Sequence, residues 1–335
     1  MGEQTGLVFV LAIVLGYVYA FVGGFTDAAN AIATSVGSRV LSPRAAVILA
    51  GAFNLLGGLS GTAVALTIGK GLVDPAALSL VTVVAGLAGA MTWSLLTYRI
   101  GIPVSETHGL IGGLIGAGIA TSGVGVIQWN GLSKTLIAIV ASPALGFLGG
   151  FVIIVSIYWV VYNKARGHVM PVFRHLQRAS AAYMAFSHGR NDAQKPMGVL
   201  AMAIALHYGS KEVTVPTWIV VSCALVAAVG TAYGGWRIIR TLGLRMTALD
   251  PVQGFAAEVS GASVIQAASE LGIPISTTHA ITSSILGVGA ARRLSAVRWG
   301  VTFRIFLSWI LTVPATVFFG AVALWGLRAV LPLLR

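Results

Sequence analysis

Two copies of one short motif decide the fold of this chain. The first is Gly-Ile-Pro-Val-Ser-Glu-Thr-His at 101–108, and the second is Gly-Ile-Pro-Ile-Ser-Thr-Thr-His at 272–279. Proline ends an incoming helix and suits the first turn of a new one. Each motif opens a short apolar stretch, 102–120 or 273–290. We therefore predict two interrupted or re-entrant helices instead of plain spans.

A second pair of motifs repeats in the same order along the chain. Gly-Phe-Thr-Asp-Ala-Ala-Asn at 24–30 resembles Gly-Arg-Asn-Asp-Ala-Gln-Lys at 189–195. Similar order at similar spacing indicates an internal duplication. With five apolar segments in each half, the two copies are expected to lie inverted in the membrane, an arrangement typical of secondary transporters.

Composition agrees with a membrane protein and excludes a soluble one. Only 9% of the 335 residues are charged, whereas a soluble domain carries about 25%. Mean hydropathy is +0.91, and apolar runs occur along the whole chain. At about 20 residues per span, we predict an all-α polytopic membrane protein with about ten embedded segments. The single cysteine, Cys223, excludes an internal disulfide and a cysteine-rich metal site.

The basic residues predict the orientation of the chain. We divide it into a first inverted repeat at 1–163, a cytoplasmic basic loop or linker at 164–178, and a second inverted repeat at 179–335. If the N-terminus lies outside, most of the 21 Lys and Arg residues face inward. This bias predicts that both termini lie outside, and it explains the net charge of +12 without a nucleic-acid partner. The outward-facing cations are Lys70, Lys134, Lys211, Arg328 and Arg335.

Two aspartates inside apolar stretches are the first functional candidates. Asp27 and Asp192 occupy equivalent positions in the repeats, and an ionisable side chain at membrane depth is costly unless it has a role. The alternative is a structural aspartate that caps a broken helix. Asn30 would share a helical face with Asp27, so oxygens of both side chains could ligate a small cation. Lys195 replaces this asparagine in the second copy and could pair with Asp192 or face an anion.

The hydroxyl groups after each proline are the second set of candidates. A new helix offers unpaired N–H groups and the positive end of its dipole, and neighbouring hydroxyls add donors. Together these groups form a site for a dehydrated anion. Glu106, within the first copy, is a candidate for carrying a proton or ligating a cation. His188, Arg190 and Asn191 are candidates for positioning the anion, whereas His108 and His279 are expected to be packing residues. The hydroxyl candidates are Ser105, Thr107, Ser276, Thr277 and Thr278.

These motifs resemble the duplicated signatures of the inorganic phosphate transporter (PiT) family. The matching stretches are 24–38, 187–198 and both Gly-Ile-Pro segments, and the resemblance spans nearly the whole chain. It implies an all-helical inverted-repeat fold, often dimeric, that imports phosphate by cation symport and alternating access. The residues that it assigns to the central phosphate and cation sites are Asp27, Asn30, Asp192, Ser105, Thr107, Ser276, Thr277 and Thr278.

Departures from the family pattern bear on the coupling ion. Sodium-coupled members have Asn-Asp in both signatures and an asparagine three residues after each aspartate. Here Thr26 precedes Asp27, and Lys195 takes the place of the second asparagine. This resembles the bacterial proton-coupled branch, in which phosphate travels as a metal–phosphate complex, and Asp27 and Asp192 are then the expected metal ligands. The resemblance implies no cofactor, H⁺ or Na⁺ as coupling ion, and a prokaryotic plasma (inner) membrane.

Four other functions stay open at this point. The family contains sulfate permeases and sodium-coupled phosphate symporters, so fold alone does not choose the anion or the cation. A membrane-embedded enzyme using Asp and His would turn over substrate without a gradient, and a passive anion channel would never exceed electrochemical equilibrium. The duplicated, inverted layout argues against an enzyme, because an enzyme needs access from one side only.

Overall fold

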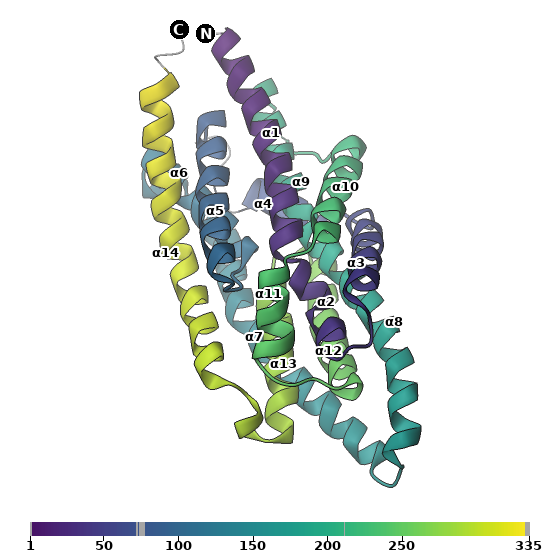
Figure 1. Cartoon of the computed structure of the whole chain (residues 1–335). Helices are drawn as coiled ribbons and strands as arrows, with labels where there is room; N and C mark the ends of the chain where they lie inside the picture. Colours follow the sequence, from purple (N-terminus) through teal and green to yellow (C-terminus); the bar gives the residue numbers. More distant parts are fainter. Residues whose placement is uncertain (1, 72, 74–77, 211, 332–335) are drawn as a thin grey trace.

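The computed structural model describes residues 2–71, 73, 78–210 and 212–331, and this part of the chain is built from helices. The bridge Val73–Ile127 is its one described β contact. The first half contains α1 (Gly2–Thr26), α2 (Ala28–Gly37), α3 (Pro43–Gly58), α4 (Ala63–Gly71), α5 (Leu80–Ile100), α6 (Glu106–Ser122) and α7 (Trp129–Val161). The second half contains α8 (Arg166–Asp192), α9 (Gln194–Tyr208), α10 (Thr217–Tyr233), α11 (Trp236–Arg240), α12 (Pro251–Glu270), α13 (Thr277–Arg292) and α14 (Trp299–Val330). Figure 1 shows these helices as one elongated bundle.

The order of elements is the same in the two halves. Each half begins with a helix that is interrupted by a one-residue junction, α1–α2 or α8–α9. A bent pair follows, α3–α4 or α10–α11, with angles of 69° and 55° at the bends. Each half then has a helix, a break, a short helix, a single 3₁₀ turn and a long final helix.

Both predicted Gly-Ile-Pro breaks are confirmed. The α5 helix ends at Ile100 and α6 begins at Glu106, with Gly101 in the left-handed region at φ +71°. Gly272 ends α12 in the same way at φ +66°. Glycine adopts this backbone conformation without steric cost, and the proline that follows prevents the helix from continuing.

The predicted count of about ten membrane segments is not confirmed. Four described helices are long and apolar enough to cross a membrane, or up to six spans if each bent pair counts as one. The helices α6, α9 and α13 contain 17, 15 and 16 residues, which is short for a span. The polar residues at the starts of these helices are buried, so the helices begin inside the protein.

The polarity of the basic segment 164–178 predicted a loop, and this prediction is wrong. Helix α8 begins at Arg166 and runs unbroken through this segment. Phe173 is buried, and its ring lies 5.5 Å from that of Phe255 on α12. This apolar contact gives the first turns of α8 a packing partner, which the charge pattern concealed.

The two halves exchange their last helices. Helix α7 of the first half packs on α13 of the second, and α14 of the second packs on α6 of the first. Glycines allow the close approach at both contacts: a Cβ at Gly116 would lie 2.0 Å from the Val317 oxygen, and one at Gly287 would lie 2.1 Å from the Phe147 oxygen. Neither half therefore completes its packing alone.

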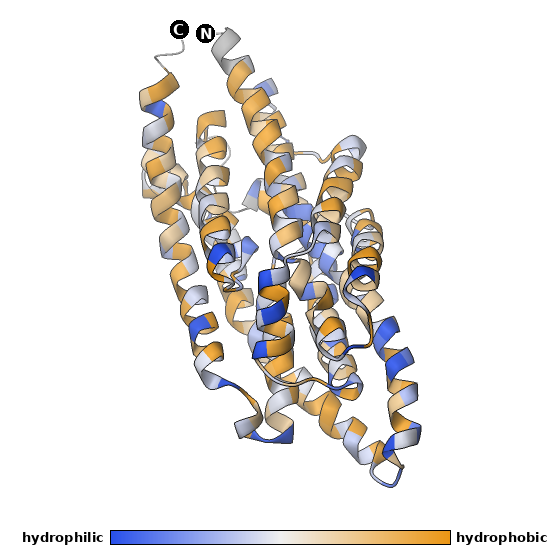
Figure 2. Ribbon diagram, viewed as in Figure 1, coloured by the Kyte–Doolittle hydropathy of each residue, from blue (hydrophilic) through white to orange (hydrophobic). Residues whose placement is uncertain are grey.

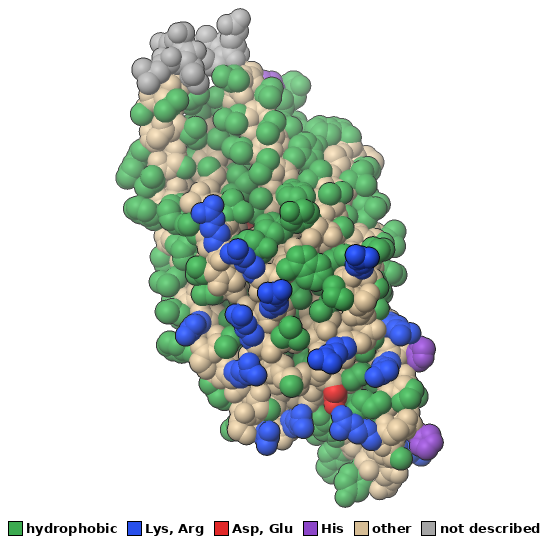
Figure 3. Space-filling view, viewed as in Figure 1, with side chains coloured by type: hydrophobic (Ala, Val, Ile, Leu, Met, Phe, Trp, Pro, Cys, Tyr) green, Lys and Arg blue, Asp and Glu red, His purple; other side chains and the backbone are tan. Residues whose placement is uncertain are grey.

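Charge is distributed unevenly along the length of the molecule. Both termini lie at one end of the bundle, and apolar residues cover most of α1, α5 and α14 (Figures 1 and 2). On the visible face in Figure 3, Lys and Arg side chains gather over the half away from the termini. Of the cations predicted to face outward, Lys211 and Arg335 lie outside the described residues.

Candidate functional site

Four interruptions of the helices meet at one buried centre. Two are the junctions at Asp27, between α1 and α2, and at Ala193, directly after Asp192. The other two are the breaks before α6 and α13. Side-chain hydrogen bonds connect these four places, so residues far apart in the sequence form one polar cluster.

The two re-entrant breaks hold each other through reciprocal hydrogen bonds. Thr107 Oγ1 donates to the Ile275 carbonyl at 2.6 Å, and Thr278 Oγ1 lies 3.0 Å from the Val104 carbonyl. The equivalent residues of the two motifs thus exchange the same kind of contact. Next to them the rings of His108 and His279 lie 4.7 Å apart, edge to face, and His279 stacks on Trp309 at 3.7 Å.

Asp27 and Asn30 face the second break from the first half. Asn30 Nδ2 donates to Thr277 Oγ1 at 3.1 Å and to Thr278 Oγ1 at 2.9 Å. Thr278 Oγ1 is also 3.3 Å from Asp27 Oδ1. Asp27 makes no side-chain cap to α2, which argues against the capping role. Asp27 Oδ2 and Asn30 Oδ1 are both buried and have no hydrogen-bond partner among the described residues.

Three residues contact the carboxylate of Asp192, two through ion-pair contacts and one through a hydrogen bond. Lys195 Nζ lies 2.8 Å from Oδ1, and Lys195 is only 2% exposed. His188 Nε2 lies 3.2 Å from Oδ2, and Thr277 Oγ1 donates to the same oxygen at 3.1 Å. The predicted pairing of Lys195 with Asp192 is therefore present in the structure.

The hydroxyls of Ser105 and Ser276 cap the re-entrant helices. Each accepts from the backbone N–H three residues later, His108 at 3.2 Å and His279 at 3.1 Å. The first N–H groups of each helix, at Glu106 and Thr107 and at their counterparts Thr277 and Thr278, have no acceptor among the described residues. These N–H groups point from two helix N-termini into the same centre, as an anion site requires.

Two predicted site residues are engaged elsewhere. Glu106 is buried, and hydroxyls of Thr26 and Ser94 donate to its two carboxylate oxygens, each at 2.7 Å. Asn191 directs its amide to Ser269 on α12, at 3.0 Å, instead of toward Asp192. The carboxyl of Glu106 therefore lies on the α1–α5 side of the centre, and Asn191 lies at its edge.

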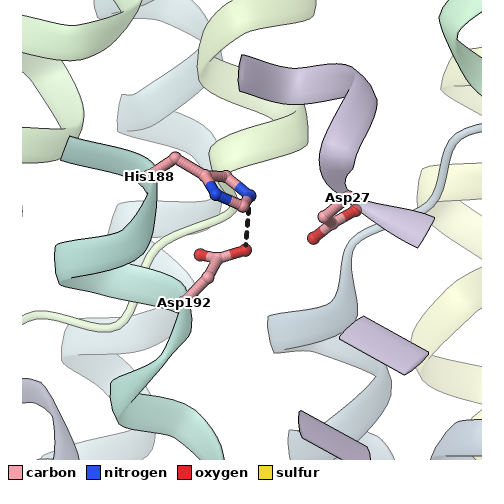
Figure 4. Close-up of side chains that lie close together, drawn as sticks. All are labelled: Asp27, His188 and Asp192. Atoms are coloured by element: carbon pink, nitrogen blue, oxygen red, sulfur yellow. Dashed lines mark ion pairs between the residues drawn. The ribbon is translucent and has the colours of Figure 1, made fainter. Parts of the chain in front are cut away.

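The centre contains a geometrically possible metal site. Ligand atoms of Asp27, His188 and Asp192 all lie within 4.8 Å of one another, and Figure 4 shows the three side chains converging. A cavity of about 10 Å³ lies beside Asp192, His188 and Lys195. This is about the room that one water molecule needs, so the centre must open to admit a larger anion.

The sequence left two buried polar contacts unassigned. Asn54, inside the apolar stretch that became α3, contacts His188 and Thr231. Glu258 on α12 accepts hydrogen bonds from Thr34, Gln177 and Ser180. In both cases a polar side chain within an apolar stretch could have indicated a buried hydrogen bond. The sequence could not identify the partners, because they lie on helices that are distant in the sequence.

Comparisons with known proteins agree with this arrangement. Residues 23–320 match the phosphate transporter family, PHO4. A probable low-affinity inorganic phosphate transporter of Rhizobium meliloti (strain 1021) is 46% identical over 305 residues, which cover 90% of this chain and 91% of the relative. A protein of the same description from Bacillus subtilis (strain 168) is 38% identical over 326 residues, covering 96% and 97%.

A solved structure shares the fold along almost the entire chain. It is described as the sodium-dependent phosphate transporter, and it is 28% identical with a TM-score of 0.87. The match covers 97% of this chain and 100% of the other. The family and the names of the relatives indicate a multi-pass membrane transporter and not an enzyme. This chain belongs to the phosphate transporter family.

Proposed function

We propose that this chain is a secondary active transporter that imports inorganic phosphate by proton symport. The observation that carries the proposal is the meeting of two hydroxyl-rich helix N-termini with two interrupted helices that carry aspartates. Membership of the phosphate transporter family supports phosphate as the anion.

The re-entrant helices form the phosphate-binding part of the site. The free N–H groups at the starts of α6 and α13 supply donors and positive dipole ends. The cap hydroxyls of Ser105 and Ser276 add donors, and Thr107, Thr277 and Thr278 add theirs when the centre opens and their hydrogens leave their present acceptors. Backbone and hydroxyl donors replace the water that phosphate loses on entering. Phosphate then needs no arginine in the site.

Asp27 and Asn30 form the part of the site that takes the coupling cation. Each has a buried oxygen without a partner among the described residues, which suits a proton or a small cation. A cation on Asp27 offsets the charge of phosphate, so the loaded centre is nearer to neutral and crosses the apolar interior at a lower cost. Asn191 and Glu106, engaged elsewhere in this conformation, are proposed to contact phosphate or carry the proton when the centre opens.

The position of Lys195 favours a proton over sodium. Its ammonium group already neutralises Asp192 at 2.8 Å, where a second cation would otherwise bind. The sodium-dependent structural relative makes sodium coupling through Asp27 and Asn30 the second candidate. If phosphate travels with a divalent metal as one cargo, the carboxylates of Asp27 and Asp192 are the proposed ligands.

Alternating access by two inverted halves is the proposed transport cycle. The matched order of elements and the reciprocal contacts between the Gly-Ile-Pro breaks support the duplication. The grouping of cations away from the termini supports an orientation with both termini outside. Likeness to the family is the basis for proposing a homodimer in a prokaryotic plasma membrane.

Reconstituted protein tests this function directly. Proteoliposomes receive an inward proton gradient or an inward sodium gradient separately, and accumulation of labelled phosphate is measured. The proposal expects accumulation above equilibrium with the proton gradient alone, and its loss in Asp27→Asn. Strict dependence on sodium would establish the second candidate, and flux that only reaches equilibrium would indicate a channel. Stronger competition by sulfate than by unlabelled phosphate would identify a sulfate permease.

A further inference from the structure

Asn54 meets His188 directly behind the proposed site. Asn54 lies in the middle of α3 and is 2% exposed, and His188 on α8 is fully buried. The two helices touch here, since a Cβ at Gly189 would lie 2.2 Å from the backbone oxygen of Asn54. Glycine beside His188 thus allows an amide from another helix to reach the imidazole.

The hydrogen bonds of Thr231 determine the orientation of the Asn54 side-chain amide. A threonine hydroxyl has one hydrogen, and Thr231 donates it to the Ala227 carbonyl at 3.0 Å. Its oxygen can therefore only accept from Asn54, at 2.6 Å. If the amide of Asn54 were flipped, its side-chain oxygen would face Thr231 Oγ1, whose only hydrogen is already donated to Ala227. The NH₂ group of Asn54 therefore faces both Thr231 and His188.

The orientation of the Asn54 amide determines which nitrogen of the His188 ring carries the proton. The second hydrogen of Asn54 Nδ2 points at His188 Nδ1, which is 3.2 Å away. An Nδ1 that accepts carries no proton, so the ring proton sits on Nε2. Nε2 lies 3.2 Å from Asp192 Oδ2, in an ion-pair contact (Figure 4). Nδ1 therefore accepts from Asn54, and the proton on Nε2 lies beside the carboxylate of Asp192.

We propose that Asn54 is a positioning residue that holds His188 in the Nε2–H tautomer, so that a protonated Nε2 lies beside Asp192 and His188 does not ligate metal ions. A metal needs the lone pair of a ring nitrogen, and neither nitrogen has one free in this arrangement. The cluster of Asp27, His188 and Asp192 then has only carboxylates to offer a cation. The inference deepens the proposed function, because it excludes His188 from any metal–phosphate cargo.

The wild-type protein provides the first test. Protein with ¹⁵N-labelled histidine is reconstituted in lipid, and solid-state NMR identifies which ring nitrogen of each of the six histidines carries a proton. The His188 signal is assigned by its loss in His188→Gln. The proposal expects a protonated Nε2 and an unprotonated Nδ1 for His188. The opposite tautomer would overturn it, and this result does not depend on any variant of Asn54 folding.

A substitution that reverses the hydrogen bond provides the second test. In Asn54→Asp the carboxylate can accept from Nδ1, which moves the ring proton to Nδ1 and frees Nε2 beside Asp192. Orientation of a histidine by a carboxylate typically changes metal affinity by about 10–100-fold. We expect Asn54→Asp to bind Co²⁺ more tightly by this factor and to show absorption bands of imidazole-bound cobalt. The increase in affinity should disappear in the double variant Asn54→Asp with His188→Gln.

The matched control is Asn191→Asp. Asn191 is also buried on α8, but its amide contacts Ser269 and not an imidazole. The substitution Asn191→Asp adds the same charge near the centre as Asn54→Asp does. We expect it to leave the tautomer of His188 unchanged. A wild-type His188 spectrum with unchanged Co²⁺ affinity in Asn54→Asp would overturn the role of Asn54. The NMR signal of His188 and the affinity for Co²⁺ do not depend on transport. A failure of the proposed function would therefore appear in the phosphate uptake assay and not in these two measurements.

Discussion

At the scale of single residues, the two central aspartates differ in how fully they are paired. Asp192 has ion-pair contacts with Lys195 at one oxygen and with His188 at the other, where Thr277 also donates a hydrogen bond. Asp27 has one long contact to Thr278 and one oxygen without a described partner. The duplicated aspartates therefore have separate proposed tasks: Asp27 receives the coupling cation, and Asp192 holds the donors in place.

Asp192→Asn should abolish phosphate uptake and also weaken the fold. Removing one partner of a buried ion pair costs about 3–5 kcal/mol, because the other charge stays buried without compensation. Adding Lys195→Met should restore most of the thermal stability in detergent but no uptake. Glu270→Gln is the control. The side chain of Glu270 is 57% exposed, so its ion pair with Arg190 should contribute little to the free energy of unfolding. Unchanged uptake in Asp192→Asn would refute the proposed mechanism.

At the scale of the elements, the two re-entrant breaks behave as one unit. Thr107 and Thr278 connect them through hydrogen bonds to backbone carbonyls that no helix satisfies. The hydroxyls therefore serve the fold as well as the proposed phosphate site.

Thr107→Val should destabilise the protein by about 1–3 kcal/mol, the cost of leaving a buried carbonyl unsatisfied. Thr135→Val is the matched control, because Thr135 is equally buried but bonds only to Gly131 of its own helix. Thermal unfolding in detergent should separate the two variants. Equal midpoints would show that the contact to Ile275 contributes nothing.

Gly116→Ala and Gly287→Ala should each separate a pair of exchanged helices. The added methyl group would meet a backbone oxygen, which cannot move like a side chain, and overpacking typically costs about 1–3 kcal/mol. Gly326→Ala, on α14 with no atom near its added Cβ, should be neutral or slightly stabilising. Unfolding midpoints of the three variants test the difference, and a tolerated Gly116→Ala would contradict the packing argument.

Local chemistry made the breaks predictable, but not the contacts between them. Pro103 and Pro274 stop a helix wherever it lies, so the interruptions follow from sequence alone. The pairing of Thr107 with Ile275, and of Asn54 with His188, depends on which helices are neighbours. Periodicity carries no information on that choice, and it likewise did not show that the basic segment at 164–178 would extend α8.

At the scale of the whole molecule, charge is asymmetric about the bundle. The termini share one end, and on the face in Figure 3 the cations lie over the other half. Anionic lipid and the positive-inside rule would hold the basic half at the cytoplasm.

Cysteine labelling should reveal this orientation. In a Cys223→Ala background, Ser210→Cys should react with an impermeant maleimide added outside intact cells, whereas Gly167→Cys should react only after the membrane is opened. Both positions are exposed, so access and not burial decides the result. Labelling of Gly167→Cys from outside would contradict the proposed orientation.

The exchange of α7 and α14 between the halves has a consequence for assembly. Each half leaves the groove on its α6 or α13 bare until the other half arrives, so a fragment ending near Asn163 would expose glycine-lined backbone to lipid. Two fragments divided at this turn should be degraded when synthesised singly and recovered as a stable pair when synthesised in the same cell. Folding of the first half is therefore expected to finish only when α14 has been synthesised and can pack on α6.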